Sequence, residues 1–421
     1  MSAHEVKRRL QEQIRERLDL GISLTDAELR ERIEEEVFAY ARQAHLTAAA
    51  MEKLVAALFH SFRGLDVLQP LVEDRSITEI MINSHDRIFV ERDGQVVETD
   101  IRFDSREKLE DVIQTIVGKV NRVVNESSPI VDARLADGSR VNIVLPPAAL
   151  NGPVMTIRKF PERPPSLDDL IAWGALSEEA ARFLTDLVKA KFNIFISGGT
   201  GSGKTTFLNA LAQHIPGDER VITIEDSAEL QIRGVPNLVS LETRNANSEG
   251  KGEISIRDLI RTSLRMRPNR IIVGEVRGAE ALDMLQAMNT GHEGSLSTGH
   301  ANSAADMMSR LETMVLSGAE LPIQVVRKQI ASALDIVVHL QRMRDRSRKV
   351  AEISEVLGLR EGEVELRPLY RFEESGEDEG GRLRGELVRT GHRLHNVEKL
   401  RMAGIACGHE HDRNGGRDGA P

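Results

Sequence analysis

The run from Asn193 to Leu208 limits the possible folds of this chain more than any other segment. An apolar strand, Asn193 to Ser197, leads into a glycine-rich loop, and Phe207 and Leu208 then begin a helix. The loop fits the pattern G-x-x-x-x-G-K-[ST] in the strand–loop–helix context that gives the pattern its meaning. Its backbone N–H groups and the helix N-terminus can converge on phosphate oxygens. The loop residues are Gly198, Gly199, Thr200, Gly201, Ser202, Gly203, Lys204, Thr205 and Thr206.

Two side chains of this loop predict the ligand. Lys204 is expected to reach the β- and γ-phosphates of a nucleotide, and the Thr205 hydroxyl is expected to ligate Mg²⁺. The loop by itself predicts a site for a nucleoside triphosphate with Mg²⁺, and together with the motifs below the predicted cofactors are ATP and Mg²⁺. The alternative is a glycine-rich turn without a ligand, which the preceding strand and following helix disfavour.

Hydrolysis needs a carboxylate near the attacking water, and two acids follow apolar strands. The strand Arg270 to Val273 is followed by Gly274, where many P-loop proteins place a metal-binding Asp, and then by Glu275. Glu275 is the candidate for polarising water, directly or through Mg²⁺, against the alternative of a surface acid after a core strand. Glu225, after the strand Val221 to Ile224, could orient water or a metal ligand. A helix-capping role fits Glu225 equally well.

Histidines occur in the segment Gly291 to Asn302. His292 and His300 could donate hydrogen bonds to phosphate oxygens. Zinc binding is a competing interpretation, but no properly spaced third ligand accompanies them. A purely structural histidine is the remaining alternative. His300 is the predicted nucleotide-contacting residue.

Arginines complete the set of predicted site residues. Arg140 and Arg158 lie on predicted strands, and closure of the first domain over the nucleotide would bring them to the γ-phosphate. Without that closure they would be solvated surface arginines. A second group is expected on one helix face, which could meet a partner or simply face solvent. Its members are Arg257, Arg261, Arg265 and Arg267.

The pattern of apolar residues divides the chain into several parts. The first part has narrow helical stripes, and the second mixes short strands with a helix expected over Arg106 to Val123. A proline-rich segment then separates it from alternating strands and helices, which predict a mostly parallel sheet. The predicted parts are a helical module 1–65, an α+β domain 66–160, a linker 161–166, an α/β ATPase domain 167–345, a β/α extension 346–404 and a disordered tail 405–421.

Composition excludes several classes of protein. The formal net charge of -10 argues against a general nucleic-acid binder, so no specific nucleic acid is expected as a partner. No segment has the roughly 20 consecutive apolar residues of a membrane span, so no direct membrane insertion is expected. Cys407 is the single cysteine, which fits a cytoplasmic protein. Its neighbours His409 and His411 invite a metal interpretation, which their close spacing disfavours.

Taken together, these motifs resemble the secretion-ATPase superfamily that serves type II and type IV secretion and pilus assembly. Within it, the chain looks most similar to the tight-adherence (Flp) pilus assembly ATPase. The segments that carry the resemblance are ITEIMINSHDRIFVERDGQ from Ile77, the run from Arg140 to Phe160, LRMRPNRIIVGEVRG from Leu264 and LQAMNTGHEGSLSTGHANS from Leu285. The superfamily typically lacks the Asp at the position of Gly274 and keeps the glutamate.

The resemblance implies an α/β fold in which a RecA-like P-loop NTPase domain follows an α+β, PAS-like N-terminal domain and a small helical module. It also implies a homohexameric ring in which the N-terminal domain closes on ATP, with Arg140 and Arg158 touching phosphate. Its implied partners are polytopic inner-membrane platform proteins of a pilus or secretion system. The protein would then be cytoplasmic and associated with the membrane through those partners.

Three functions are therefore compared. The leading hypothesis is an ATPase motor for pilus assembly or secretion across the bacterial inner membrane. A DNA-transfer or pilus-retraction ATPase of the same superfamily is the first alternative. The second is a nucleotide-gated assembly scaffold without hydrolysis, which the presence of Lys204, Thr205 and Glu275 disfavours.

Overall fold

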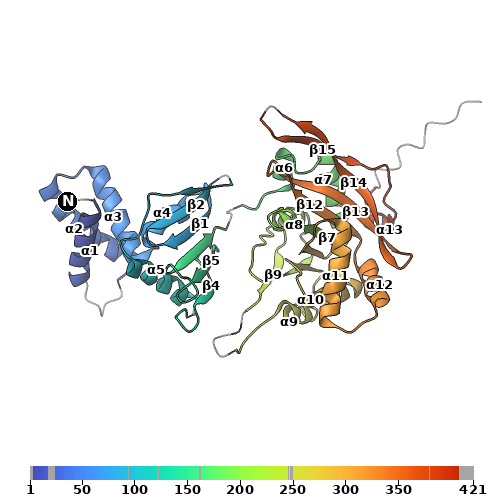
Figure 1. Cartoon of the computed structure of the whole chain (residues 1–421), viewed down its shortest axis with the longest axis horizontal. Coiled ribbons are helices and arrows are strands. Elements are labelled where there is room, and N and C mark those ends of the chain that lie inside the picture. The colour runs from blue at the N-terminus through green and yellow to red at the C-terminus, as the bar shows by residue number, and fades with distance from the viewer. Residues whose placement is uncertain are drawn as a thin grey trace, which may run out of the picture. The chain divides into compact units, whose positions relative to one another are not determined.

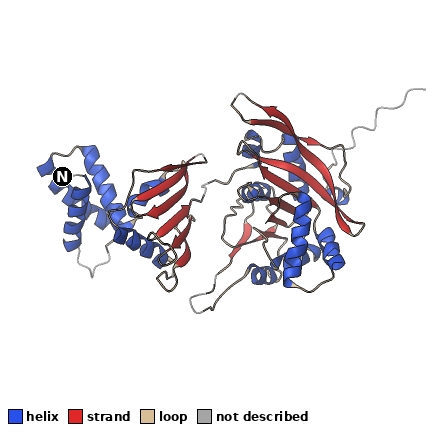
Figure 2. Ribbon diagram, in the orientation of Figure 1, coloured by secondary structure: helices blue, strands red, loops and turns tan. Residues whose placement is uncertain are grey.

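The computed structural model describes residues 3–17, 24–92, 94–120, 123–160, 163–244, 246, 250–378 and 380–406. The chain divides into two compact units, Met1–Glu162 and Arg163–Pro421. Each unit has its own hydrophobic core and its own sheet (Figures 1 and 2). Within the described residues, no helix is both long enough and apolar enough to cross a membrane.

The first unit begins with packed helices: α1 (Ala3–Arg17), α2 (Asp26–Ala44) and α3 (Ala48–Arg63). Thr25 starts α2 with a capping box, in which its hydroxyl accepts from the Glu28 N–H and the Glu28 carboxylate accepts from the Thr25 N–H. The helices bury the apolar stripes of their sequences in a shared core. Its buried members are Val6, Leu10, Ile14, Leu29, Ile33, Val37, Val55 and Leu58.

An antiparallel sheet makes up the rest of the first unit, after the short helices η1 (Asp66–Leu68) and α4 (Gln69–Glu73). Its strand order is β3-β2-β1-β6-β5-β4. Helix α5 (Arg106–Lys119) packs its apolar stripe against one face of the sheet. The strands are β1 (Ile77–Ser84), β2 (Arg87–Arg92), β3 (Gln95–Glu98), β4 (Ile130–Arg134), β5 (Arg140–Val144) and β6 (Val154–Arg158).

Helix α5 is shorter than its sequence predicts. It ends at Lys119, where the Val120 N–H turns back to the carbonyls of Val117 and Gly118. Val123 is 70% exposed and therefore lies off the buried stripe. The expected extension to Val123 is wrong because apolar spacing continues past the point where the backbone leaves the helix.

A mixed sheet forms the centre of the second unit, in the order β15-β14-β13-β12-β7-β11-β10-β8-β9. The strands from β12 to β9 in this order are parallel to their neighbours, while β13, β14 and β15 extend the sheet with antiparallel pairing. The strands are β7 (Ile194–Gly198), β8 (Arg220–Glu225), β9 (Asn237–Glu242), β10 (Arg270–Val273), β11 (Leu296–His300), β12 (Ile336–Arg342), β13 (Arg348–Arg360), β14 (Glu363–Glu377) and β15 (Leu383–Arg389).

Helices cover both faces of this sheet. Helices α6, α7, α8 and α13 share a core with one face, and α9, α10, α11 and α12 share a core with the other. Because parallel strands end at a common edge, the loops after β7, β8, β10 and β11 lie at that edge of the sheet. The helices are α6 (Leu167–Ala172), α7 (Glu178–Lys189), α8 (Lys204–Ala212), α9 (Ile256–Ser263), α10 (Glu280–Asn289), α11 (Ala304–Gly318), α12 (Ile323–Ala333) and α13 (Glu398–Met402).

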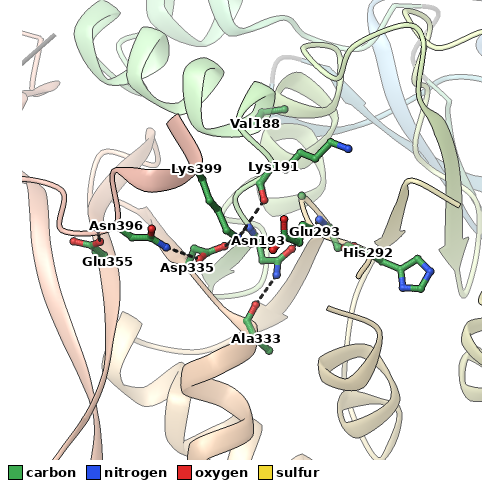
Figure 3. Close-up of polar contacts among 12 residues, drawn as sticks. Val188, Lys191, Asn193, His292, Glu293, Ala333, Asp335, Glu355, Asn396 and Lys399 are labelled. Carbon is green, nitrogen blue, oxygen red and sulfur yellow. Dashed lines mark hydrogen bonds and ion pairs between the residues drawn. The ribbon is translucent and has the colours of Figure 1, made fainter. Parts of the chain in front are cut away.

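Polar contacts hold the opposite edge, where the parallel strands begin (Figure 3). The Asn193 N–H donates to Asp335 Oδ2 at 2.7 Å, and the Asn193 side-chain amide donates to the Ala333 carbonyl at 2.7 Å. Lys399 of α13 brings its ammonium to 2.8 Å from the same Asp335 oxygen. The start of β7 is thereby tied to β12 and to the C-terminal helix.

A buried ion pair reinforces this edge. The Arg270 side chain is fully buried and binds both carboxylate oxygens of Glu219, at 2.5 and 2.9 Å. It also donates to the Val188 carbonyl at 2.6 Å. A Cβ added at Gly294 would lie 2.6 Å from an Arg270 guanidinium nitrogen, so glycine leaves the space that this arginine needs.

In the first unit, a buried acid of η1 lies between α1 and α5. Asp66 is 3% exposed and lies 2.7 Å from the Lys7 ammonium of α1. Lys108 of α5 is farther away, at 3.9 Å. Removing one partner of a buried charge pair leaves the other charge uncompensated. The Lys7–Asp66 contact should therefore matter for the stability of this unit.

We expect Lys7→Met to lower the free energy of unfolding of the first unit by about 3 kcal/mol. Guanidinium denaturation of the whole chain, followed by circular dichroism, measures the shift, because the single Trp of the chain, Trp173, lies in the other unit. The exposed Arg9 on the same helix supplies the control, and Arg9→Met should change stability by less than about 0.5 kcal/mol. Equal effects of the two substitutions would contradict the importance of the pair.

Candidate functional site

The phosphate loop runs from the end of β7 into α8. Gly203 has φ 93° and occupies the N-cap of α8, a left-handed conformation that favours glycine. At Gly198, an added Cβ would lie 2.5 Å from the Leu340 carbonyl oxygen and from Ser202 Oγ. These glycines allow the backbone to turn sharply between the sheet and the helix, as the sequence predicts.

Lys204 lies in the first turn of α8 and is largely buried. Its ammonium donates to the Gly199 carbonyl at 3.0 Å and lies 3.3 Å from His300 Nδ1. Burial lowers the pKa of Lys204, and the nearby charge of Glu275 opposes that shift. The next residue, Thr205, is half-buried in the same turn.

His300 connects this lysine to the acid after β10. Its Nε2 lies 2.6 Å from Glu275 Oε1, while its Nδ1 faces Lys204. Burial and then the charge of Lys204 lower the pKa of His300, against the effect of Glu275. The structure thus brings together Lys204, Glu275 and His300 from three separate elements.

Arg277 is a site residue that the sequence analysis missed. Its guanidinium donates to Glu275 Oε2 at 2.6 and 2.9 Å and lies 3.7 Å from Asp226. The contact with Glu275 is the main cause that raises the pKa of Arg277. A basic residue two positions after the candidate acid was the available signal. In an irregular segment, however, spacing alone does not show that two side chains meet.

Glu225 is buried behind Gly274. A Cβ added at Gly274 would lie 2.8 Å from Glu225 Cγ, so an Asp at position 274 would collide with this side chain. The Glu225 carboxylate accepts hydrogen bonds from the N–H groups of Glu229 and Leu230, at 2.9 and 3.1 Å. Burial raises its pKa to about 7, although these hydrogen bonds oppose the shift.

His292 lies away from this group, at the other end of β11. His292 Nδ1 is 3.2 Å from the Ala287 carbonyl, and its ring points away from the polar contacts at the far edge of the sheet (Figure 3). Arg140 and Arg158 are register partners on β5 and β6 of the first unit. Cys407, His409 and His411 lie outside the described residues.

The four arginines expected on one helix face do not share a helix. Arg257 and Arg261 lie on α9 and both bind the buried carboxylate of Asp283, at 2.7 and 2.9 Å. Helix α9 ends at Ser263, so Arg265 and Arg267 are not on it. The expectation of one four-residue helical face is wrong, because the helix is shorter than the spacing suggests.

The residues beside the loop fit Mg·ATP. Glu275 Oε1 is buried and accepts no hydrogen bond of normal geometry from the described residues, although His300 lies close enough for an ion pair. The Lys204 ammonium and the glycine-rich backbone provide the donors that phosphate needs, and Thr205 provides a hydroxyl. In the part of the chain that the structure describes, no group of three His, Cys, Asp or Glu residues could hold a metal by itself. A metal at this site would therefore need ligands from the nucleotide, as Mg²⁺ commonly does.

Comparison with known proteins shows the family of this chain. Residues 62–381 match the family described as type II/IV secretion system protein. The chain belongs to this family. It is 34% identical to the conjugal transfer protein TrbB of Rhizobium radiobacter, over 73% of this chain and 93% of the relative. It is 33% identical to the type IV secretion system protein VirB11 of Brucella suis, over 69% of this chain and 87% of that protein.

A solved structure supports the fold of this secretion-family chain. The pilus retraction motor PilT, determined with bound ADP, aligns with a TM-score of 0.52 at 19% identity, over 81% of this chain and 87% of PilT. The family membership and this likeness confirm the predicted α/β, RecA-like fold class and the predicted secretion-ATPase superfamily.

For this secretion-family protein, the buried Glu225 predicts a pH-dependent stability. Its folded pKa of about 7 exceeds the unfolded value of 4.5, so the folded state binds more protons between these values. Stability should therefore fall as pH rises from about 4.5 to 7 and should stay level above that range. The size of this change is of the order of 3 kcal/mol.

Glu225→Gln removes the ionisable group and keeps most of the side-chain volume. We expect the stability of the wild type, measured relative to this variant, to decrease between pH 5 and pH 8. Thermal or chemical denaturation across that range measures the difference. A constant difference between the two proteins would show that Glu225 titrates at its ordinary pKa.

Proposed function

We propose that this chain is an ATPase motor that drives pilus assembly or protein secretion across a bacterial inner membrane. The observation that carries the proposal is the contact between Lys204, His300 and Glu275 beside the phosphate loop. An acid, an imidazole and an ammonium from separate elements form the kind of group that phosphoryl transfer requires. A nucleotide-gated scaffold that does not hydrolyse ATP would have no use for Glu275 at this position.

The roles of the residues follow from their chemistry. Lys204 and the loop N–H groups hold the β- and γ-phosphates, and Thr205 is the protein ligand for Mg²⁺. When bound, the metal stabilises negative charge on the phosphates. Glu275 orients the attacking water or accepts its proton. His300 lies between Lys204 and Glu275. When Lys204 binds phosphate, His300 can therefore change the position of the Glu275 carboxylate.

We further propose a homohexameric ring in which the first unit closes on the nucleotide. In support, Arg140 and Arg158 are opposite each other on neighbouring strands and share one face of the sheet. Their neighbours Val141 and Ile157 are buried on the α5 side, so the arginines belong to the opposite face. Two adjacent guanidinium groups suit a phosphate-binding surface.

The cellular setting is part of the same proposal. The motor would be cytoplasmic and would associate with polytopic inner-membrane platform proteins, and the Flp pilus system is the one whose motifs it resembles. The conjugal transfer name of one relative favours DNA transfer as a second candidate. Stimulation of ATP turnover by DNA would favour that candidate. Stimulation by a platform protein would favour the first.

Phosphate release by the purified chain with Mg·ATP tests the enzymatic assignment. We expect Lys204→Ala to abolish both nucleotide binding and turnover. Glu275→Gln should reduce turnover at least about 100-fold while ATP still binds, because the acid acts on water rather than on the phosphates. Equal turnover of the wild type and both variants would contradict the catalytic assignment.

If the first unit closes on the nucleotide, substitution of its arginines should lower turnover without preventing ATP binding. Arg140→Gln or Arg158→Gln should leave ATP binding within about twofold but lower turnover at least about tenfold, since charge stabilisation at the γ-phosphate is lost. Turnover and equilibrium binding of the whole chain measure the two effects. The exposed Arg102 of the same unit provides the control, and Arg102→Gln should match the wild type. Unchanged turnover in both arginine variants would refute the closure.

A further inference from the structure

A hairpin of the second unit brings arginines to the phosphate loop from a distant part of the sequence. Arg342 ends β12, Arg348 begins β13, and the two are opposite each other in the antiparallel pairing. Strand β12 runs parallel to β7, with Leu340 beside Gly198. Because Gly198 is the last residue of β7, the hairpin extends past that strand and stands next to the loop.

Both arginines lie against this loop. Arg348 Nε donates to the Gly201 carbonyl at 3.0 Å. A Cβ added at Gly201 would lie 3.9 Å from a guanidinium nitrogen of Arg342, and one added at Gly203 would lie 3.3 Å from Arg348 Cδ. The loop and the hairpin therefore fit closely together.

Among the residues that the structure describes, these two arginines contact the backbone of the loop but no acidic side chain. Within the described residues, neither Arg342 nor Arg348 forms an ion pair with a carboxylate. By contrast, Arg344 in the same hairpin binds Glu374 and Glu377 of β14. That pairing anchors the hairpin, while Arg342 and the terminal nitrogens of Arg348 stand beside the loop.

The order of the strands indicates which part of a nucleotide these groups would meet. Strand β12 lies on one side of β7, while β11 and β10, which lead to His300 and Glu275, lie on the other. The terminal phosphate must face Glu275 for hydrolysis, so the nucleoside must leave the loop toward the other side. Guanidinium groups stack on aromatic bases and donate to hydroxyl oxygens.

We propose that Arg342 and Arg348 bind the ribose and base of ATP rather than its terminal phosphate. This inference rests on the proposed function of the phosphate loop and adds a nucleoside subsite to it. Besides its hydrogen bond to the Gly201 carbonyl, Arg348 contacts the nucleoside with the rest of its guanidinium. The C-terminal strands thereby become part of the nucleotide site.

Equilibrium binding of ATP, ADP and inorganic tripolyphosphate to the full chain tests this assignment. Arg342→Gln and Arg348→Gln should each weaken ATP and ADP binding by the same factor, about tenfold, the size of one base-stacking contact. Tripolyphosphate has no nucleoside, so its affinity should stay within about twofold. Arg346→Gln is the matched control, because Arg346 is exposed in the same hairpin, and it should bind all three ligands like the wild type.

Each other outcome has a distinct meaning. Loss of ATP affinity without loss of ADP affinity would overturn the inference, because the arginines would then contact the γ-phosphate. Equal weakening of tripolyphosphate and ATP would also overturn it, since the arginines would merely shape the loop. Unchanged affinities in both variants would overturn it while the proposed function stands. A wild-type chain that binds no nucleotide would contradict the proposed function itself.

Discussion

Burial of the Lys204 ammonium is the constraint on which the site depends. The phosphate loop offers it a carbonyl oxygen but no negative charge, and burial alone disfavours the charged form. Glu275 supplies the compensating charge through its position after β10, and His300 lies between them. Glu275 also binds Arg277, so two cationic groups share this one carboxylate. A nucleotide brings its own negative charge, so its binding must change the partners of Lys204 and thus the surroundings of Glu275.

Such a rearrangement at one edge of the sheet requires the other edge to remain fixed. There, Arg270 binds Glu219 and Asp335 receives both Asn193 and Lys399. The Arg270–Glu219 pair is buried and the contacts of Asp335 are partly buried, so breaking any one of them is costly. The parallel strands are therefore held at their amino ends, while the polar groups at their carboxyl ends have partners that they can exchange. Changes at the nucleotide edge can then move loops and the hairpin without separating the strands.

The sequence predicts the parts of this site that lie within continuous motifs. The phosphate loop and Glu275 each follow an apolar strand, so parallel pairing alone brings them to one edge. The two histidines show the limit of this reasoning. They occur in one short segment, yet β11 runs between them and carries His300 to the loop and His292 to the opposite end. Arg342 and Arg348 could not be predicted at all, because their approach to the loop depends on the register of β12 against β7.

The close approach of Glu225 to Gly274 explains why this chain has a glycine where many P-loop proteins place a metal-binding Asp. The Glu225 side chain of the neighbouring strand takes the space for a side chain at position 274, just after β10, so an Asp would fit there only if Glu225 moved. Glu225 does not replace the missing charge fully, since burial raises its pKa to about 7 and part of it is protonated at neutral pH. The acid that remains close to the loop is Glu275, which is held by His300 and Arg277. In the proposed function, Thr205 and the phosphates would therefore supply the direct ligands of a metal bound with the nucleotide, and Glu275 would act on water.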